Sequence, residues 1–285
     1  MSVIVSGGSG FLGSHLIEHL AEQGHTIFNY DLAEGYDLLD EGMMSRVFKH
    51  FKPERVYHLG GSVHMGPAEE DPLKDMQVNY GGTLNILRQC EKHGSRLLYT
   101  GTGASYGLCG SIQHEEDPPM PVSNYGISKL AAELLVRKYV WCHGLQGVVT
   151  RFSSVYGPRR NAGPVNLMLR NALQKRWIRV DGAGHHTRDL VEVGDALEGA
   201  VTVMEKGKPG EVYNIGSGVE TSIVELAWMI HELTGAEIRH VPFKYSAFDV
   251  PRSRYDVEKA RALGYEPKVS IRDGVQRLYE AMKVE

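Results

Sequence analysis

A tyrosine and a lysine lie four residues apart in the segment SNYGISKLAAELL, at Tyr125 and Lys129. The segment has the periodicity of a helix, on which residues four apart lie on the same face. One interpretation is a surface aromatic beside a lysine, which is common on helices. If both side chains instead face a shared site, the ammonium lowers the pKa of the phenol from its usual value of about 10, because nearby positive charge favours phenolate. Tyr125 would then be a usable general base near neutral pH.

A glycine-rich turn near the start of the chain could hold the phosphates of a dinucleotide. In VIVSGGSGFLG, the glycines Gly7, Gly10 and Gly13 lie between a buried strand and a helix. Such a turn lets the backbone approach a pyrophosphate, which then lies at the helix N-terminus, where free N–H groups and the helix dipole favour negative charge. The alternative is a plain tight turn. We expect Gly7, Gly10, Phe11, Leu12 and Gly13 to contact the cofactor.

An acid follows the glycine turn by about 20 residues, as dinucleotide sites require. Asp31 ends the strand-like run TIFNY, and a carboxylate there accepts hydrogen bonds from the adenosine ribose hydroxyls and repels a 2′-phosphate. No lysine or arginine occurs between Asp31 and Arg46, so NAD is favoured over NADP as the cofactor. Further along, Asp37 and Leu38 are candidates for the adenine side of the site, although a solvated loop acid would also explain Asp37.

These residues must be positioned by the alternation of strands and helices that fills the N-terminal half. Strand-like runs alternate with amphipathic helical segments such as FLGSHLIEHLAEQG, and the runs occur at residues 3–5, 26–30, 55–59, 96–99 and 147–151. This repeated strand–helix–strand order predicts an α/β fold, a Rossmann-type, doubly wound parallel sheet with helices on both faces.

The second half of the chain is less regular, and we expect it to form a smaller α/β substrate-binding region. It has a helix near NLMLRNALQ, a strand EVYNIG, and a helix that begins at Ser222, whose spacing to Glu225 predicts a capping box. We assign residues 1–163 to the NAD-binding domain and 164–285 mainly to the substrate region, with residues about 187–218 returning to the first domain. No linker-like tract separates the two, so they are expected to be intertwined.

Composition and charge exclude several classes of protein. The 285 residues are 42% hydrophobic and 23% charged, with a formal net charge of −4, so no field would attract nucleic acid or a membrane surface. No apolar run reaches about 18 residues. The cysteines Cys90, Cys109 and Cys142 are far apart, and the 13 histidines lack metal-site spacing, so we expect neither disulfides nor a metal. A soluble, cytoplasmic protein is expected.

Motifs along almost the whole chain resemble those of one family. Besides the glycine turn and the Tyr125–Lys129 pair, they are RVYHLGG, DMQVNYGGTLNIL, LLYTGTGASYG, RFSSVYGP, HTRDLVEVGDAL, GEVYNIGSG and PRSRYDVEKARALGYEP. In order and spacing the chain resembles an extended short-chain dehydrogenase/reductase of the branch of nucleotide-sugar epimerases and dehydratases, closest to UDP-glucose 4-epimerase-like members. The resemblance implies NAD, a nucleotide-diphosphate sugar as substrate, and a homodimer. It also implies that the cofactor site includes Leu59, Gly60, Gly61, Asn79, Tyr125 and Lys129, with Lys129 holding the cofactor ribose.

The resemblance assigns a catalytic role to Thr102, four residues before the tyrosine of the YG pair in TGTGASYG. Its hydroxyl can both donate and accept, so it is expected to hold the reacting sugar oxygen and to relay a proton to Tyr125. Similar dehydratases place Asp-Glu directly after this threonine, and similar sugar-acid decarboxylases place Glu two residues after it. Here those positions are Gly103 and Ala104, so nothing at this point can protonate a leaving group.

Groups that hold the substrate diphosphate are expected from the second half of the chain. By resemblance these are Arg188 and Arg252, since a guanidinium suits two phosphate oxygens. Two surface arginines would be the alternative, and Arg254 competes with Arg252 for the role. Ser154 stands where similar enzymes have an asparagine that reaches the substrate phosphate, so a changed phosphate contact is expected there.

Together these features favour NAD-dependent epimerisation of a nucleotide-diphosphate sugar, at C4 through a transient 4-keto sugar, with a UDP-glucose/UDP-galactose-like substrate. This reaction needs only hydride and proton exchange, and a cationic nicotinamide ring would add to the effect of Lys129 on Tyr125. Two alternatives stay open: an NAD(H)-dependent dehydrogenase or reductase of a sugar or keto-sugar nucleotide, and a non-catalytic dinucleotide sensor.

Overall fold

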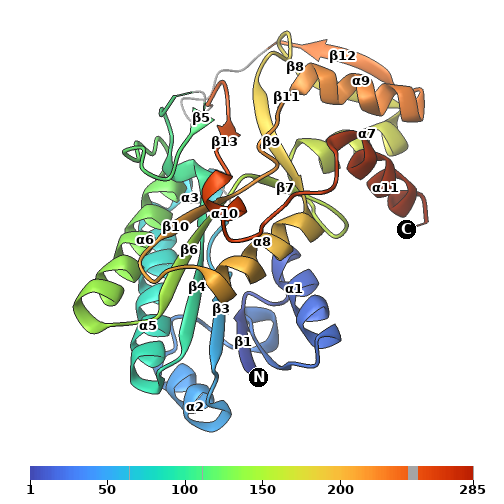
Figure 1. Ribbon diagram of the computed structural model, residues 1–285. Helices are drawn as coiled ribbons and strands as arrows, with labels where there is room; N and C mark the ends of the chain where they lie inside the picture. The colour runs from blue at the N-terminus through green and yellow to red at the C-terminus, as the bar shows by residue number, and fades with distance from the viewer. Residues whose placement is uncertain (64, 111, 243–249, 285) are drawn as a thin grey trace.

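A six-stranded parallel sheet forms the centre of the molecule (Figure 1). We describe it from a computed structural model, for residues 1–63, 65–110, 112–242 and 250–284. The strands are β1 (Ser2–Ser6), β2 (Thr26–Tyr30), β3 (Arg55–His58), β4 (Arg96–Thr102), β6 (Gly147–Phe152) and β10 (Val212–Ile215). Their spatial order is β10-β6-β4-β3-β1-β2. The predicted α/β, doubly wound architecture is confirmed.

The order of the strands fixes where ligands can bind. From β1 the chain crosses to β2 on one side and then returns to β3 on the other side of β1. The direction of winding therefore reverses between β1 and β3. In open α/β sheets, ligands bind in the crevice beyond the carboxyl ends of the strands at such a switch point.

Helices cover both faces of the sheet. Successive residues of a strand point to opposite sides, so apolar side chains on each face are buried by the helices. One face packs on α1 (Phe11–Glu22) and α8 (Val193–Lys206), and the other packs on α2 (Glu41–Phe51), α5 (Gly82–His93) and α6 (Asn124–His143) (Figure 1). In β1, Val3 and Val5 belong to the first core and Ile4 to the second. The two cores bury the central strands of the sheet on both faces, as is usual for a parallel sheet, while the edge strand β2 is only partly buried.

Local signals set the ends of α6, the helix that carries Tyr125 and Lys129. Ser123 has extended backbone and its side chain accepts a hydrogen bond from the N–H of Gly126, at 3.0 Å. At the other end Gly144 adopts the left-handed conformation (φ 70°) that favours glycine. The N-cap places Tyr125 in the first turn of the helix, at the carboxyl edge of the sheet.

A separate group of helices and strands lies beyond this edge (Figure 1). Around a third core are packed α7 (Pro164–Lys175), α9 (Ile223–Thr234) and α11 (Ile271–Val284), with the parallel pair β8 (Trp177–Asp181) and β12 (Glu237–Val241). A three-stranded sheet of β7 (Ser154–Tyr156), β9 (Thr187–Glu192) and β11 (Glu220–Ser222) connects this group to the main sheet. The capping box predicted at Ser222 and Glu225 is confirmed at the start of α9.

The chain passes repeatedly between the two parts, and residues 257–265 later return to the first core. After β9, helix α8 packs on the main sheet and β10 completes its edge beside β6. The chain then leaves again to form β11.

Short elements complete the structure. They are the 3₁₀ turns at Leu32–Glu34 and Gly103–Ser105, a π-helical turn at Gln77–Gly81, helices α3 (Met65–Glu70), α4 (Pro72–Met76) and α10 (Glu258–Arg261), and the parallel pair β5 (Ile112–Gln113) and β13 (Arg254–Tyr255). In the described part of the chain, no helix is both long and apolar enough to span a membrane.

Candidate active site

A cleft of about 1630 Å³ opens at the carboxyl edge of the main sheet. Its walls come from the turn after β1, the ends of β2, β3 and β4, the start of α6, and the segment after β6. Pockets for one small ligand are usually about 300–1,000 Å³. This cleft therefore has room for two ligands, such as a dinucleotide and a nucleotide sugar.

Most of the predicted site residues line this one cleft. They are Gly7, Gly10, Phe11, Leu12, Gly13, Asp31, Asp37, Leu38, Leu59, Gly60, Gly61, Thr102, Tyr125, Lys129, Ser154 and Arg188. Two others, Asn79 and Arg252, are not among the described residues that line it. The folding of the chain thus brings together residues that are separated by up to 181 positions, from Gly7 to Arg188.

The glycine turn is closely packed against the loop that follows β3. Gly7 has φ +73°, and a Cβ added to it would lie 2.6 Å from the backbone N of Gly60. Gly10 is the N-cap of α1 and supplies no capping side chain. The first-turn N–H groups of α1 thus lack a side-chain acceptor and lie beside the cleft, where a pyrophosphate would be stabilised. These residues fit a dinucleotide.

The acid at the end of β2 is held in place by backbone N–H groups. Asp31 accepts hydrogen bonds from the N–H of Ser9 (3.0 Å) and from the N–H of Ala33 (2.9 Å). A carboxylate has about four acceptor positions, so others remain for ribose hydroxyls. Asp37 also borders the cleft, and its side chain accepts from the N–H of Leu39 at 2.9 Å.

A buried histidine, His58, is connected by hydrogen bonds to the loop that lines the cofactor side of the cleft. His58 Nε2 lies 2.9 Å from the hydroxyl of Thr83, which donates its own proton to the carbonyl of Asn79. Nε2 therefore carries the proton, and Nδ1 accepts from the Ser6 hydroxyl at 2.6 Å. Ser6 in turn accepts from the N–H of Gly60 at 3.2 Å. Burial lowers the pKa of His58 to about 3, so this chain of hydrogen bonds stays neutral and fixes the loop at Gly60.

Asn79 acts from behind the same loop. Its side-chain oxygen accepts from the N–H of Ser62 (2.9 Å), and its amide donates to Ser128 on α6 (2.9 Å) and to Asp75 (3.3 Å). Ser128 also donates to Asp75. Asn79 lies in the π-helical turn, and such turns are frequent at functional sites. It thus connects the loop after β3 to α6, although it is not among the described residues that line the cleft.

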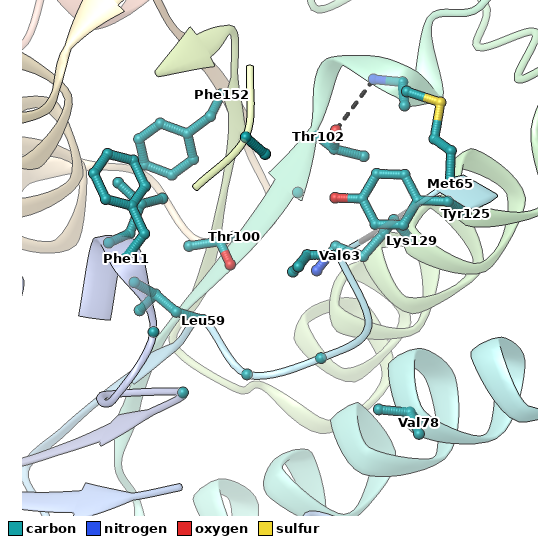
Figure 2. A pocket seen from close by; sticks show the side chains of 18 of the residues that line it. Phe11, Leu59, Val63, Met65, Val78, Thr100, Thr102, Tyr125, Lys129 and Phe152 are labelled. Atoms are coloured by element: carbon teal, nitrogen blue, oxygen red, sulfur yellow. Dashed lines mark hydrogen bonds between the residues drawn. The ribbon is translucent and has the colours of Figure 1, made fainter. Parts of the chain in front are cut away.

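Thr102, Tyr125 and Lys129 meet on the other side of the cleft. Figure 2 shows the hydroxyl of Tyr125 and the side chain of Thr102 pointing into the same space, with Lys129 close behind. The Thr102 oxygen accepts from the N–H of Ala104 at 3.2 Å, so its O–H remains able to donate. The Lys129 ammonium lies 4.4 Å from the centroid of the Tyr99 ring.

The electrostatics of this group differ in one respect from the sequence expectation. Burial raises the pKa of Tyr125, and Asp75 adds to the rise, whereas Thr102 and Arg160 oppose it. Burial lowers the pKa of Lys129 to about 7, although Asp75 and Glu133 counteract the fall. The depressed Tyr125 pKa expected from Lys129 is therefore not found in the protein alone, because desolvation of the phenolate outweighs the surrounding charge.

The predicted phosphate-binding residues are placed differently from one another. Arg188 lines the cleft and donates to the carbonyls of Thr187 (2.7 Å) and Val250 (2.9 Å). The side chain of Arg252 is 60% exposed and forms a two-pronged ion pair with Glu220. Its competitor Arg254 donates to the carbonyl of Gly218 at 2.9 Å. The structure thus brings Arg188, but not Arg252, to the cleft.

Several residues of the site were not predicted from the sequence. Arg160 lines the cleft after the YGP turn, while Asp75 and His58 lie buried behind it. Tyr255 lines the cleft from the far end of the chain. A basic residue after a turn or an acid in the DPLKDM segment is a weak signal by itself. Among the described residues, no group of three or more histidine, cysteine, aspartate or glutamate side chains could hold a metal ion.

Comparisons with known proteins agree with this geometry. The model of the NAD dependent epimerase/dehydratase family matches residues 3–216. The structure of the UDP-glucose 4-epimerase of Thermotoga maritima with UDP-glucose is similar, with a TM-score of 0.94, 31% identity, and coverage of 100% of this chain and 99% of that chain. The same enzyme of Thermus thermophilus, in complex with NAD, has a TM-score of 0.91 and 30% identity, with 99% of each chain covered.

An enzyme of different activity is equally similar in sequence. Human dTDP-D-glucose 4,6-dehydratase is 31% identical over 313 residues, which cover 98% of this chain and 89% of the relative. Sequence identity alone therefore does not distinguish an epimerase from a dehydratase here. The predictions of NAD as cofactor and of the extended short-chain dehydrogenase/reductase family are confirmed. On its fold, its cleft and these matches, the chain belongs to the NAD dependent epimerase/dehydratase family.

Proposed function

We propose that the protein is an NAD-dependent 4-epimerase of a nucleotide-diphosphate sugar, with a UDP-glucose-like substrate. The observation that carries this proposal is the convergence of Thr102, Tyr125 and Lys129 in a cleft where the next two residues, Gly103 and Ala104, bear no acid. Elimination of a sugar hydroxyl as water needs a proton donor for the leaving group. Epimerisation needs none, since the sugar loses and regains only one hydride and one proton.

The chain's own residues then handle the proton of the C4 hydroxyl. Tyr125 takes this proton, directly or through the hydroxyl of Thr102, and the sugar becomes a 4-ketone. When bound, NAD supplies two things: a ring that can accept a hydride and give it back, and, in the oxidised form, the positive charge of that ring. The ketone turns over about the diphosphate linkage, and Tyr125 returns the proton once the opposite face is presented.

Positive charge is needed to make Tyr125 an effective base. Its pKa is raised by burial in the protein alone, and Lys129, with a pKa of about 7, is only partly charged near neutrality. A cationic cofactor ring beside the phenol favours phenolate. We therefore expect Tyr125 to become an efficient base only in the complex with oxidised NAD.

The residues proposed to hold the sugar nucleotide lie along the remaining wall of the cleft. Arg188 and Arg160 both line it and are suited to phosphate oxygens, since each guanidinium offers several donors in a fixed plane. Ser154 lies in the same wall, at the start of β7. Arg252 would have to leave Glu220 before it could contribute.

The experiment that tests the proposal uses purified protein without added cofactor. It is incubated with UDP-, GDP-, CDP- and dTDP-sugars, and anomeric proton signals are followed by NMR. We expect the signal of the C4 epimer to appear for one of them with no lasting change in absorbance at 340 nm. Net reduction of NAD without interconversion would instead identify a dehydrogenase, and loss of water from the sugar would identify a dehydratase.

We also propose that the protein forms a homodimer through α6. Ile127, Leu134 and Trp141 follow one another at intervals of seven residues on this helix, and they are 45%, 49% and 65% exposed. Residues at this spacing lie on one face, so they form an apolar stripe on the side of α6 away from the sheet. Light scattering with size-exclusion chromatography should give twice the 31.6 kDa chain mass, and Leu134→Glu should give the monomer.

A further inference from the structure

The residue that follows Thr102 is glycine for an unusual reason. Gly103 is not among the residues with positive φ, so its backbone conformation is open to any amino acid. The obstacle to a side chain is Tyr255: its phenol oxygen, Cζ and Cε2 are the three atoms nearest to the position of a Cβ on Gly103, and the oxygen occupies that position. The identity of residue 103 is therefore set by a contact with a residue 152 positions later in the chain.

Tyr255 is held rigidly in this place. It lies on β13, which pairs with β5, and its N–H donates to the buried carboxylate of Asp189 at 3.1 Å. Its ring packs edge to face on Tyr106, with centroids 5.7 Å apart and planes at 77°. Only 5% of the residue is exposed, yet it contributes to the cleft wall. The phenol is thus a fixed part of the wall beside Thr102.

The hydroxyl of Tyr255 has a long hydrogen bond to the carbonyl of Phe152 and also interacts with the side chain of Ser253. It donates to the carbonyl of Phe152 at 3.4 Å, which is long for an O–H donor, whose usual distance is about 2.7–2.8 Å. It can therefore turn to a better acceptor at little cost. Burial raises the pKa of Tyr255 far above the physiological range, so the group can donate a hydrogen bond but cannot exchange a proton during turnover.

We propose that Tyr255 is a specificity-determining residue: its hydroxyl takes the place of a side chain at residue 103 and donates a hydrogen bond to the sugar of the substrate. The inference rests on the proposed function in so far as the sugar lies beside Thr102. It also explains why this chain lacks an acid after Thr102, since the space for that acid is filled by a neutral phenol. The site is thereby restricted to reactions that need no protonated leaving group.

A second glycine–tyrosine pair offers a matched control. The hydroxyl of Tyr156 lies against Gly274 in α11, in the same relation as Tyr255 to Gly103. Tyr156 is 2% exposed and is not among the described residues that line the cleft. This pair therefore reports what such a contact does for packing alone.

The first test is a pair of variants measured by thermal unfolding and by retained NAD. Gly103→Ala should lower the melting temperature by several degrees and reduce NAD occupancy, because Tyr255 must move. In the double variant that carries Gly103→Ala and Tyr255→Ala, the melting temperature and the NAD occupancy should return to the values of Tyr255→Ala alone. Gly101→Ala is the control, since its Cβ would meet the carbonyl of Thr150 at 2.9 Å, and Tyr255→Ala should not relieve it. Equal defects of Gly103→Ala with and without Tyr255→Ala would overturn the assigned contact.

The second test removes only the hydroxyl and separates the sugar from the nucleotide. With NAD-loaded protein, calorimetry compares UDP-glucose with UDP for the wild type, Tyr255→Phe and Tyr156→Phe. Loss of one hydrogen bond should weaken UDP-glucose binding by about three- to tenfold in Tyr255→Phe, with UDP unchanged within about twofold. Tyr156→Phe should alter neither ligand, whatever its effect on stability.

The outcomes separate this inference from the proposed function. Equal loss for UDP and UDP-glucose, no loss for either, or a wild type that binds both equally would overturn the sugar contact of Tyr255. A selective loss for UDP-glucose in a protein that does not epimerise any sugar would support the contact and overturn the 4-epimerase proposal. The NMR experiment on the wild type decides the latter independently.

Discussion

The two sides of the cleft are built by different means. The cofactor side consists largely of backbone: the glycine turn after β1, the loop at Leu59–Gly61 after β3, and the first N–H groups of α1. These three parts all come from the first 61 residues. The side that we propose for the sugar consists of side chains from four distant segments, carried by Thr102, Tyr125, Arg188 and Tyr255, all of which line the cleft.

This difference indicates how one family can keep a cofactor and change a reaction. A backbone-built site depends on the absence of side chains, so few substitutions are compatible with it. A side-chain-built site can be altered one residue at a time without disturbing the sheet. The pair of Gly103 and Tyr255 is an example: as we propose, it changes the chemistry available beside Thr102, and it lies outside the strand β4.

The largest effect should come from the sugar side. Tyr125→Phe removes the phenol placed to exchange the sugar proton, so kcat should fall by roughly a hundred- to ten-thousandfold. Because the cofactor side is untouched, NAD released from the denatured variant should equal that from the wild type. Turnover within tenfold of the wild type would refute the division of roles between the two sides.

The cofactor side is tested by Gly7→Ala. At φ +73° an alanine is strained, and its Cβ would lie 2.6 Å from the N of Gly60, so NAD binding should weaken by about a hundredfold through displacement of the loop, equivalent to roughly 2.7 kcal/mol. Gly24→Ala is the control, since it has φ +76° but nothing within 4 Å of its Cβ. It should lower stability by about 1 kcal/mol and retain NAD.

A smaller effect is expected at the ribose end of the cofactor side. Asp31→Asn removes the negative charge and leaves one acceptor oxygen, which can serve the N–H of Ser9 or that of Ala33 but not both, because these two groups bond to different oxygens of Asp31. The Kd for NAD should rise by about tenfold, the loss of one charge-assisted hydrogen bond, while binding of NADP improves. An unchanged ratio of the NAD and NADP affinities in titrations followed by fluorescence would show that Asp31 does not select the cofactor.

The smallest effect is expected for substitution of Asp75, which is buried behind the cofactor side and the sugar side of the cleft. Its charge raises the pKa of Lys129 and that of Tyr125. Asp75→Asn removes the charge, so both pKa values fall. The acid limb of the pH–rate profile, set by Tyr125, and the alkaline limb, set by loss of the Lys129 proton, should then both move to lower pH by up to about one unit, or about 1.4 kcal/mol. Asp40→Asn, an exposed helix cap, should leave the profile in place.

The same contrast explains which features could be predicted from the sequence. The glycine turn, Asp31 and the α6 pair are local patterns whose spacing fixes their geometry, and the structure places all of them in the cleft. The parallel sheet follows from the alternation of elements. Tyr255 and Asp75 act through contacts between segments far apart in the chain, which no local spacing encodes. For Arg252, spacing did not indicate that Glu220 lies within 2.6 Å of its guanidinium.

The Tyr125 pKa shows a different limit. The lysine beside it could be identified from the sequence, but the depth of burial could not. Desolvation by the surrounding core is a property of the whole fold, and here it outweighs the neighbouring charge.

Strand β10 pairs with β6 but follows it far along the chain, and this has a consequence for folding and for protein engineering. Every residue of β6 is buried, and Val212–Ile215 provides the only strand that covers its outer edge in the described structure. A fragment that stopped near residue 163 would expose an apolar strand edge, which readily pairs with other chains. Until Val212–Ile215 has been synthesised and has paired with β6, the chain on the ribosome is therefore prone to aggregate, and truncated cofactor-binding fragments should need a designed edge strand to stay monomeric.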